Sequence, residues 1–271
     1  MEFEPGGALV ILVDSHVHVY PVYEPEVLLK AGRDNLRCAA EDSGLDAGEA
    51  IFVMCLAERD DCGFFADLTD GKIRLKGSYS IEHSGDPEGL WLCDGDDFRV
   101  LLVAGRQWVS ACRLEVLALT ADTRIRSGEK LEQMIPAVQE AGAIPVLPWA
   151  PGKWMGARGK AVYDWISRNE RHGALLADTS FRPAGWKEPA QFSAARVRGI
   201  PVLAGTDPLP LRGEETKVGT YCQTLDGELD AIHPVQSLRK LIAGGAPEPR
   251  TIGARRSLPE VMGKQIALRF Q

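Results

Sequence analysis

The sequence predicts an α/β fold of the distorted (β/α) TIM-like barrel type, with seven or eight strands and a small antiparallel β insertion. Short, almost wholly apolar segments recur along the chain, which is typical of parallel strands that are buried on both faces. Segments of helical length separate many of them, as in proteins that alternate strand and helix. No GxGxxG turn follows any apolar segment, which disfavours a doubly wound nucleotide-binding sheet.

The composition is that of an ordinary globular protein, with 271 residues of which 45% are hydrophobic and 25% charged. This length suits one α/β barrel or two small domains, and we favour a single barrel domain over residues 1–271. The six cysteines include no CxxC pair, which argues against a zinc ribbon and against a disulfide scaffold.

The charge and the hydropathy pattern restrict the partners. The formal net charge of -7 disfavours nucleic-acid binding over the whole surface. The N-terminal segment is acidic, and no apolar run approaches the ~20 residues of a membrane span. We therefore expect a cytoplasmic protein that binds a small molecule, neither nucleic acid nor membrane. Exposed edges of the β insertion could pair between copies, which would give a homo-oligomer.

The first predicted strand, residues 9–13, is aliphatic throughout and ends in Asp14-Ser15-His16-Val17-His18. We expect a helix over 24–41, a strand over 50–61 and a short helix over 63–68. Residues 72–112 contain strand-like pieces separated by Gly, Asp and Pro, and we interpret them as the β insertion, a lid over the strand ends.

The rest of the chain alternates regularly between predicted strands and helices. The helix over 127–142 has Ser127 as its expected N-cap and Pro136 as a source of a kink. The expected strands are 114–122, 143–150, 174–180 and 200–210, and the other expected helices are 156–173, 189–199, 234–243 and 258–270.

If these strands are parallel, the residues just after them lie together at one rim, the carboxyl end of the sheet. Barrels and open α/β sheets have their active sites at this end. Two histidines at i and i+2 on a strand point to the same side, so the side chains of His16 and His18 can reach one metal ion. The alternative is a packed strand end with two satisfied histidines. Polar side chains follow the other strands too: Glu58, Arg59, Thr120, Asp122, Lys153, Asp178, Arg182, Asp207 and Arg212.

The DSHVH segment, combined with Gly205-Thr206-Asp207 after the last predicted strand, resembles the metal-dependent amidohydrolase superfamily and its relatives, the PHP-type phosphoesterases. Barrels of these families begin with an HxH motif on the first strand and end with an aspartate on the last. The resemblance implies that His16 and His18 are metal ligands. It makes Asp207 a ligand or the base that takes a proton from water.

The chain also departs from this resemblance. Such barrels usually supply further histidines from middle strands, whereas His83, His172 and His233 lie elsewhere. Lys153 is a loose counterpart of the lysine that many amidohydrolases carbamylate, and we count it among the catalytic candidates. We therefore favour one zinc or manganese ion over two, with these ligands: His16, His18, Asp178 and Asp207.

The function that follows is hydrolysis of a small anionic amide, lactone or phosphoester by water that a metal ion activates, with Asp207 as proton acceptor. Arg182 and Arg212 could bind the substrate's anionic group, although ordinary solvated loop charge is the alternative for each. Trp149 and Trp154 could wall the substrate pocket or simply pack beneath the next helix. The rival function is a metal-free barrel that serves as a binding or scaffold protein.

Overall fold

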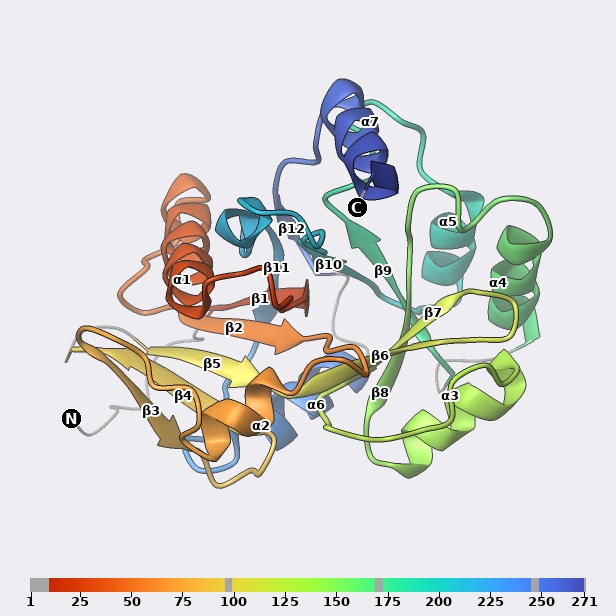
Figure 1. Cartoon of the computed structure of the whole chain (residues 1–271). Coiled ribbons are helices and arrows are strands. Elements are labelled where there is room, and N and C mark those ends of the chain that lie inside the picture. The colour runs from red at the N-terminus through yellow and green to blue at the C-terminus, as the bar shows by residue number, and fades with distance from the viewer. Residues whose placement is uncertain (1–9, 96–98, 169–172, 245–248, 271) are drawn as a thin grey trace.

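Two mixed β-sheets, of seven and five strands, form the centre of the molecule (Figure 1). The computed structural model describes residues 10–95, 99–168, 173–244 and 249–270. Their strands do not close into one hydrogen-bonded ring, so the predicted TIM-like barrel is wrong. The physical reason is that antiparallel strands interrupt the parallel order. They include Tyr221–Asp226 (β11) beside the first strand and Glu115–Leu119 (β7) within the smaller sheet.

The seven-stranded sheet has a parallel centre and antiparallel edges. Its order is β12-β11-β1-β2-β5-β4-β3. The parallel strands are β1 (Val10–Val17), β2 (Ile51–Leu56) and β5 (Arg99–Val103). The antiparallel ones are β3 (Tyr79–His83), β4 (Gly89–Asp94), β11 and β12 (Thr251–Gly253). β3, β4 and β5 form the expected meander, but β5 also pairs with β2, so this segment extends the sheet.

The five-stranded sheet has the order β10-β9-β8-β7-β6. It contains β6 (Gly105–Val109), β7, β8 (Ile144–Pro148), β9 (Leu175–Thr179) and β10 (Val202–Gly205). β8, β9 and β10 are parallel, whereas β7 is antiparallel to both β6 and β8. The carboxyl end of β7 therefore lies at the opposite end of the sheet from those of β8, β9 and β10.

Helices cover both sheets, with α3, α4 and α5 along the outer side of the smaller one (Figure 1). The helices are α1 (Pro25–Asp42), α2 (Phe64–Thr69), α3 (Leu131–Glu140), α4 (Gly156–Arg168), α5 (Ala190–Val197), α6 (Pro234–Ala243) and α7 (Leu258–Ala267). Short 3-10 turns are η1 (Glu214–Lys217) and η2 (Leu268–Phe270). None of the helices in the described ranges has the length and apolarity to cross a bilayer.

Most of these helices begin within a few residues of their predicted starts. The exception is α3, which begins at Leu131 after Lys130 as N-cap residue. The hydroxyl of Ser127 instead donates to the carbonyl of Val109 (3.1 Å), so Ser127 is not the cap.

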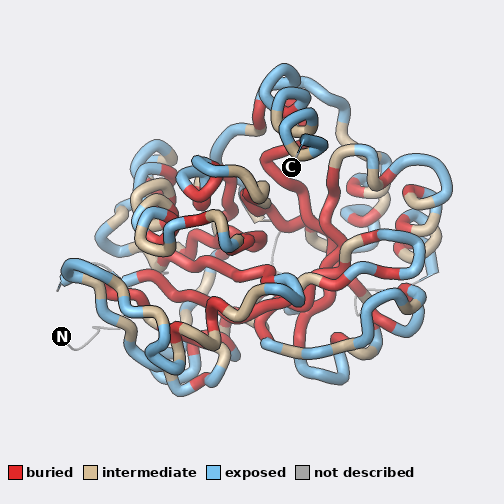
Figure 2. Tube along the Cα trace, in the orientation of Figure 1, coloured by how far each residue is buried: buried red, intermediate tan, exposed pale blue. Residues whose placement is uncertain are grey.

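The two sheets meet where β1 lies beside β10 and where the segment after β2 lies beside β6. Ser15 Oγ donates to the carbonyl of Ala204 (2.7 Å). The amide of Gln107 donates to the carbonyl of Glu58 (2.8 Å). Gly205 permits the close approach of β10 to β1, because a Cβ there would lie 2.5 Å from His16 Cβ. The strands along this junction belong to the most deeply buried part of the chain (Figure 2).

Candidate metal centre

The carboxyl end of β1 carries two buried histidines that face the same point. His16 lies within the strand and His18 directly follows it, so the alternation of side chains along a strand puts both on one side. Their Nε2 atoms are 3.0 Å apart, and their ring centroids are 4.7 Å apart. This arrangement is the one that the HxH spacing predicts.

The loop after β10 brings Asp207 to the same point. Its amide donates to the carbonyl of His16 (2.8 Å), which fixes the loop against β1. Its backbone is left-handed, with a φ of 53°, and an Asp tolerates that conformation better than most residues do. Asp207 Oδ1 lies 3.6 Å from His16 Nε2 and 3.5 Å from His18 Nε2.

These three side chains have the spacing of metal ligands. Their ligand atoms form a triangle with sides of 3.0, 3.5 and 3.6 Å. A tetrahedral ion bound at about 2.0–2.1 Å would separate its ligands by about 3.3–3.4 Å. Among the described residues, His16, His18 and Asp207 are the one such group of His, Cys, Asp or Glu side chains. The triangle fits one face of a tetrahedral site, with the fourth corner left for another ligand.

The hydrogen bond on the far side of His18 sets the direction of its lone pair. Nδ1 lies 2.6 Å from the carbonyl of Ala57, which can only accept, so Nδ1 carries the proton and Nε2 is free to coordinate. Burial lowers the pKa of His18 to about 4, against a smaller rise from the Ala57 hydrogen bond. Burial, followed by the neighbouring His18, lowers the pKa of His16 well below its usual value. Both imidazoles are therefore neutral near pH 7, as metal coordination requires.

Burial acts on Asp207 in the opposite direction and raises its pKa well above the usual carboxyl value. The negative charge of Glu115 raises it further, whereas Lys153 and Arg256 lower it. In the metal-free protein this carboxyl group therefore holds a proton more tightly than an exposed aspartate does.

Three neighbours of this cluster were not among the predicted site residues. Glu115, at the start of β7, forms an ion pair with Lys153 from the loop after β8. The Tyr20 ring lies 5.3 Å from that of His18, centroid to centroid. Gln107 extends from β6 toward both imidazoles. The reversed direction of β7, which periodicity does not reveal, is what brings Glu115 to this end of the sheet.

Asp14, next to the cluster, holds the ends of β1 and β10 together. Its buried carboxylate accepts from Thr206 N (2.8 Å), Thr206 Oγ1 (2.5 Å), Gly219 N (2.9 Å) and His16 N (3.2 Å). Burial raises the pKa of Asp14 to about 6, although these hydrogen bonds oppose the rise. Asp14 therefore positions the segments that carry His16 and Asp207.

Asp178, predicted as a ligand, lies at the end of β9 outside the cluster. Its carboxylate accepts two bonds from Arg182, to Oδ1 (2.8 Å) and Oδ2 (2.5 Å), and a third from Tyr221 OH (2.9 Å). Arg182 is itself buried and lies over the ring of Phe192. This pair stabilises the loop after β9.

The other predicted rim residues are spread more widely. Trp149 and Trp154 are both buried in the apolar core, where Trp154 packs edge-on against Phe192. Arg212 is exposed in the loop before η1. Thr120 follows β7, and because that strand is reversed it does not share the rim; Arg239 of α6 binds its carbonyl (2.6 Å).

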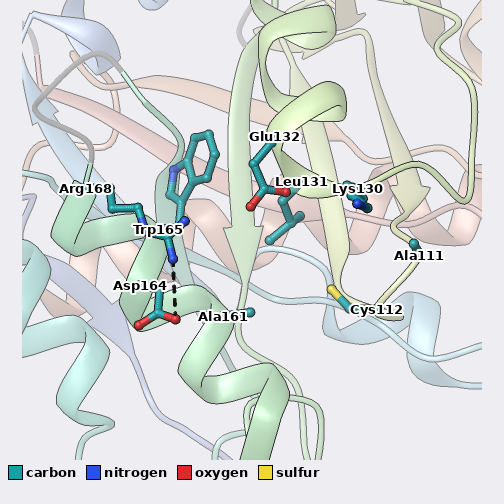
Figure 3. Close-up of a pocket in the computed structure, with 9 residues that line it drawn as sticks. All are labelled: Ala111, Cys112, Lys130, Leu131, Glu132, Ala161, Asp164, Trp165 and Arg168. Carbon is teal, nitrogen blue, oxygen red and sulfur yellow. Dashed lines mark ion pairs between the residues drawn. The ribbon is translucent and has the colours of Figure 1, made fainter.

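A separate surface pocket of about 400 Å³ lies between α3 and α4 (Figure 3). The side chains drawn around it include Lys130, Glu132 and Trp165, and an ion pair joins Arg168 to Asp164 at 3.7 Å. None of the residues that line this pocket belongs to the His16–His18–Asp207 cluster.

No protein-family model matches the chain, and no curated protein is similar in sequence. The fold, however, is similar to that of solved structures. PsfC from Pseudomonas syringae has a TM-score of 0.57 and 16% identity, over 96% of this chain and 98% of PsfC. The lesion-specific endonuclease PfuEndoQ from Pyrococcus furiosus has a TM-score of 0.53 and 12% identity, over 90% of this chain and 58% of that one. These likenesses show a shared fold.

A third structure, endonuclease Q in complex with a 27-mer duplex that has an abasic lesion at the active site, gives a TM-score of 0.47 and 10% identity. The match covers 95% of this chain and 67% of that one. The expected absence of nucleic-acid binding in this protein stays a prediction.

Proposed function

We propose that this chain is a metal-dependent hydrolase that acts on a small, anionic amide, lactone or phosphoester. The observation that supports this most directly is the convergence of His16 Nε2, His18 Nε2 and Asp207 Oδ1 within 3.6 Å of one another. The lone pair of His18 Nε2 points into this space because its Nδ1 is bound to Ala57. Lone pairs that converge in a buried site repel unless a proton or a cation lies between them.

A divalent ion held there would lower the pKa of water and polarise a carbonyl or phosphoryl group. Asp207 Oδ2 is the cluster's remaining carboxylate oxygen and can accept a proton. Lys153, held by Glu115, places a positive charge beside the cluster, where it would stabilise negative charge that develops on the attacked group. The fold likeness to a lesion-specific endonuclease favours a phosphoester among the three substrate classes.

The first test is metal content, followed by activity. Protein purified without chelators is expected to hold about one equivalent of zinc or manganese, and added metal should raise its melting temperature. Metal-loaded protein should then hydrolyse at least one member of a panel of nitroanilide amides, phosphomonoesters, phosphodiesters and lactones, with chelated protein as control. A low-salt filter-binding assay checks that it does not bind nucleic acid.

A content below about a tenth of an equivalent, with no thermal shift on adding zinc or manganese, would contradict the proposal. The rival function, a metal-free binding or scaffold protein, would then be favoured. Full metal loading without hydrolysis of any panel member would support the metal site but leave the hydrolase proposal contradicted for these substrate classes.

Metal affinity is expected to depend on pH through Asp207 and not through the histidines. At pH 5 the imidazoles are already neutral, because the pKa of His18 is about 4 and that of His16 is also depressed. The raised pKa of Asp207 means that metal must displace its proton, so affinity should increase with pH until the pH exceeds that pKa. Calorimetry in buffers of different ionisation enthalpy measures this proton release.

The matched control is Asp207→Asn, which should release no proton when it binds the residual metal. If the wild-type protein released two or more protons near pH 6, the histidines would have ordinary pKa values. The assignment of the proton to Asp207 would then be contradicted.

A further inference from the structure

Gln107 lies on β6 at the junction of the two sheets. Its amide N–H donates to the carbonyl of Glu58 (2.8 Å), and the amide of Glu58 donates to the carbonyl of Gly105 (3.0 Å). This pairing sets Gln107 beside Ala57, the residue whose carbonyl holds His18 Nδ1. The backbone of β6 is therefore fixed relative to the candidate metal centre before any side chain is considered.

The side chain of Gln107 points into that centre. It lies close enough to His16 and His18 to act against the burial that lowers their pKa values, but it makes no hydrogen bond of normal geometry with either imidazole. Its Oε1 is buried, and no donor in the described part of the chain bonds to it. A buried amide oxygen normally finds a donor, since leaving it without one costs free energy. This oxygen without a donor is thus an unused potential ligand atom beside the imidazoles of His16 and His18.

Gln223 provides a contrast within the same region. It is also buried, but its Oε1 accepts a hydrogen bond from the amide of Ala204 (2.5 Å) and so ties β11 to β10. A structural role accounts for the Gln223 oxygen. The described residues offer no comparable structural partner for the oxygen of Gln107.

We propose that Gln107 is a fourth metal ligand, which coordinates through Oε1 together with His16, His18 and Asp207. This inference rests on the metal centre proposed above. Amide oxygen is a hard, neutral donor, and oxygen-rich sites suit manganese better than sulfur or purely imidazole sites do. With two neutral imidazoles, a neutral amide and one carboxylate, a divalent ion would retain a net single positive charge. That charge would attract an anionic substrate.

The test compares metal affinity in the wild type, Gln107→Ala and Gln107→Glu. Gln107→Ala should bind zinc and manganese on the order of 10- to 100-fold more weakly, as measured by competition with a chromophoric chelator. Gln107→Glu keeps an oxygen at the same reach and adds a negative charge, so it should bind more tightly than the wild type. Gln236→Ala, at an exposed position on α6, is the control and should bind as the wild type does.

Cobalt supplies a readout that does not depend on activity. Loss of a ligand in Gln107→Ala should change the visible absorption of the cobalt-loaded protein, whereas Gln236→Ala should leave the spectrum unchanged. Wild-type affinity in both Gln107 variants, or weaker binding in Gln107→Glu than in the wild type, would overturn the inference. If Gln107→Ala does not fold, Gln107→Glu decides alone. A wild-type protein that binds no metal would instead contradict the proposed function itself.

Discussion

Replacing His18 by alanine is expected to lower metal affinity by more than about 100-fold and to abolish hydrolysis. His18 contributes the ligand atom with the most firmly fixed direction, because Ala57 holds its other nitrogen at 2.6 Å. Without it, the ligand triangle is reduced to His16 and Asp207, whose atoms are 3.6 Å apart. The measurement is zinc and manganese binding by calorimetry, with hydrolysis of the panel substrates in parallel.

His83→Ala is the matched control, since His83 is exposed on β3 at the far edge of the seven-stranded sheet. It should bind metal and hydrolyse substrate as the wild type does. The metal-free form of His18→Ala should keep its fold, because the neutral imidazole that it removes has one hydrogen-bond partner outside the cluster, the carbonyl of Ala57. Undiminished metal binding in His18→Ala would contradict the assignment of the site.

Most elements of this fold could be predicted from local pattern, but the directions of the strands could not. The run of aliphatic residues before Asp14 predicts β1, and similar runs predict β2 and β7–β10. A buried strand has the same pattern whether it runs with its neighbours or against them. Reversal of β7 was therefore missed, and the barrel prediction failed with it. β11 escaped notice because the segment Tyr221–Asp226, with Gln223 and Thr224 adjacent at its centre, is neither an apolar run nor a regular alternation of polar and apolar residues.

The candidate site shows the same division between local and long-range information. The HxH spacing places two imidazoles on one side of a strand, which needs no knowledge of the rest of the chain. Asp178 and Asp207 both follow strands and looked equivalent. Only the fold places Arg182 and Tyr221 around Asp178, which leaves Asp207 beside the histidines. No sequence motif marked Gln107 as a site residue, because its position beside the histidines depends on where β6, the edge strand of the five-stranded sheet, meets the other sheet.

Replacing Asp14 by alanine is expected to lower the free energy of unfolding by about 3–5 kcal/mol. The carboxylate accepts hydrogen bonds from the backbone at three positions and from the hydroxyl of Thr206, all in a site closed to solvent. Alanine leaves these donors buried without partners, which costs more than the bonds themselves contribute. Urea unfolding of metal-free protein at pH 7 measures the loss.

Asp14→Asn separates the shape of this side chain from its charge. Asparagine keeps one acceptor oxygen but presents an NH₂ group to the neighbouring donors. We therefore expect Asp14→Asn to be destabilised less than Asp14→Ala and more than the exposed control Asp226→Ala. The folded protein holds the Asp14 proton up to a pKa of about 6, above the ordinary 3.8. The stability that this proton contributes is therefore present below about pH 4 and lost as the pH rises through 6. Because asparagine has no such proton, the gap between Asp14→Asn and the wild type should narrow over that range. A gap that is independent of pH would contradict the raised pKa of Asp14. An alanine variant as stable as Asp226→Ala would show that Asp14 does not hold the two sheets together.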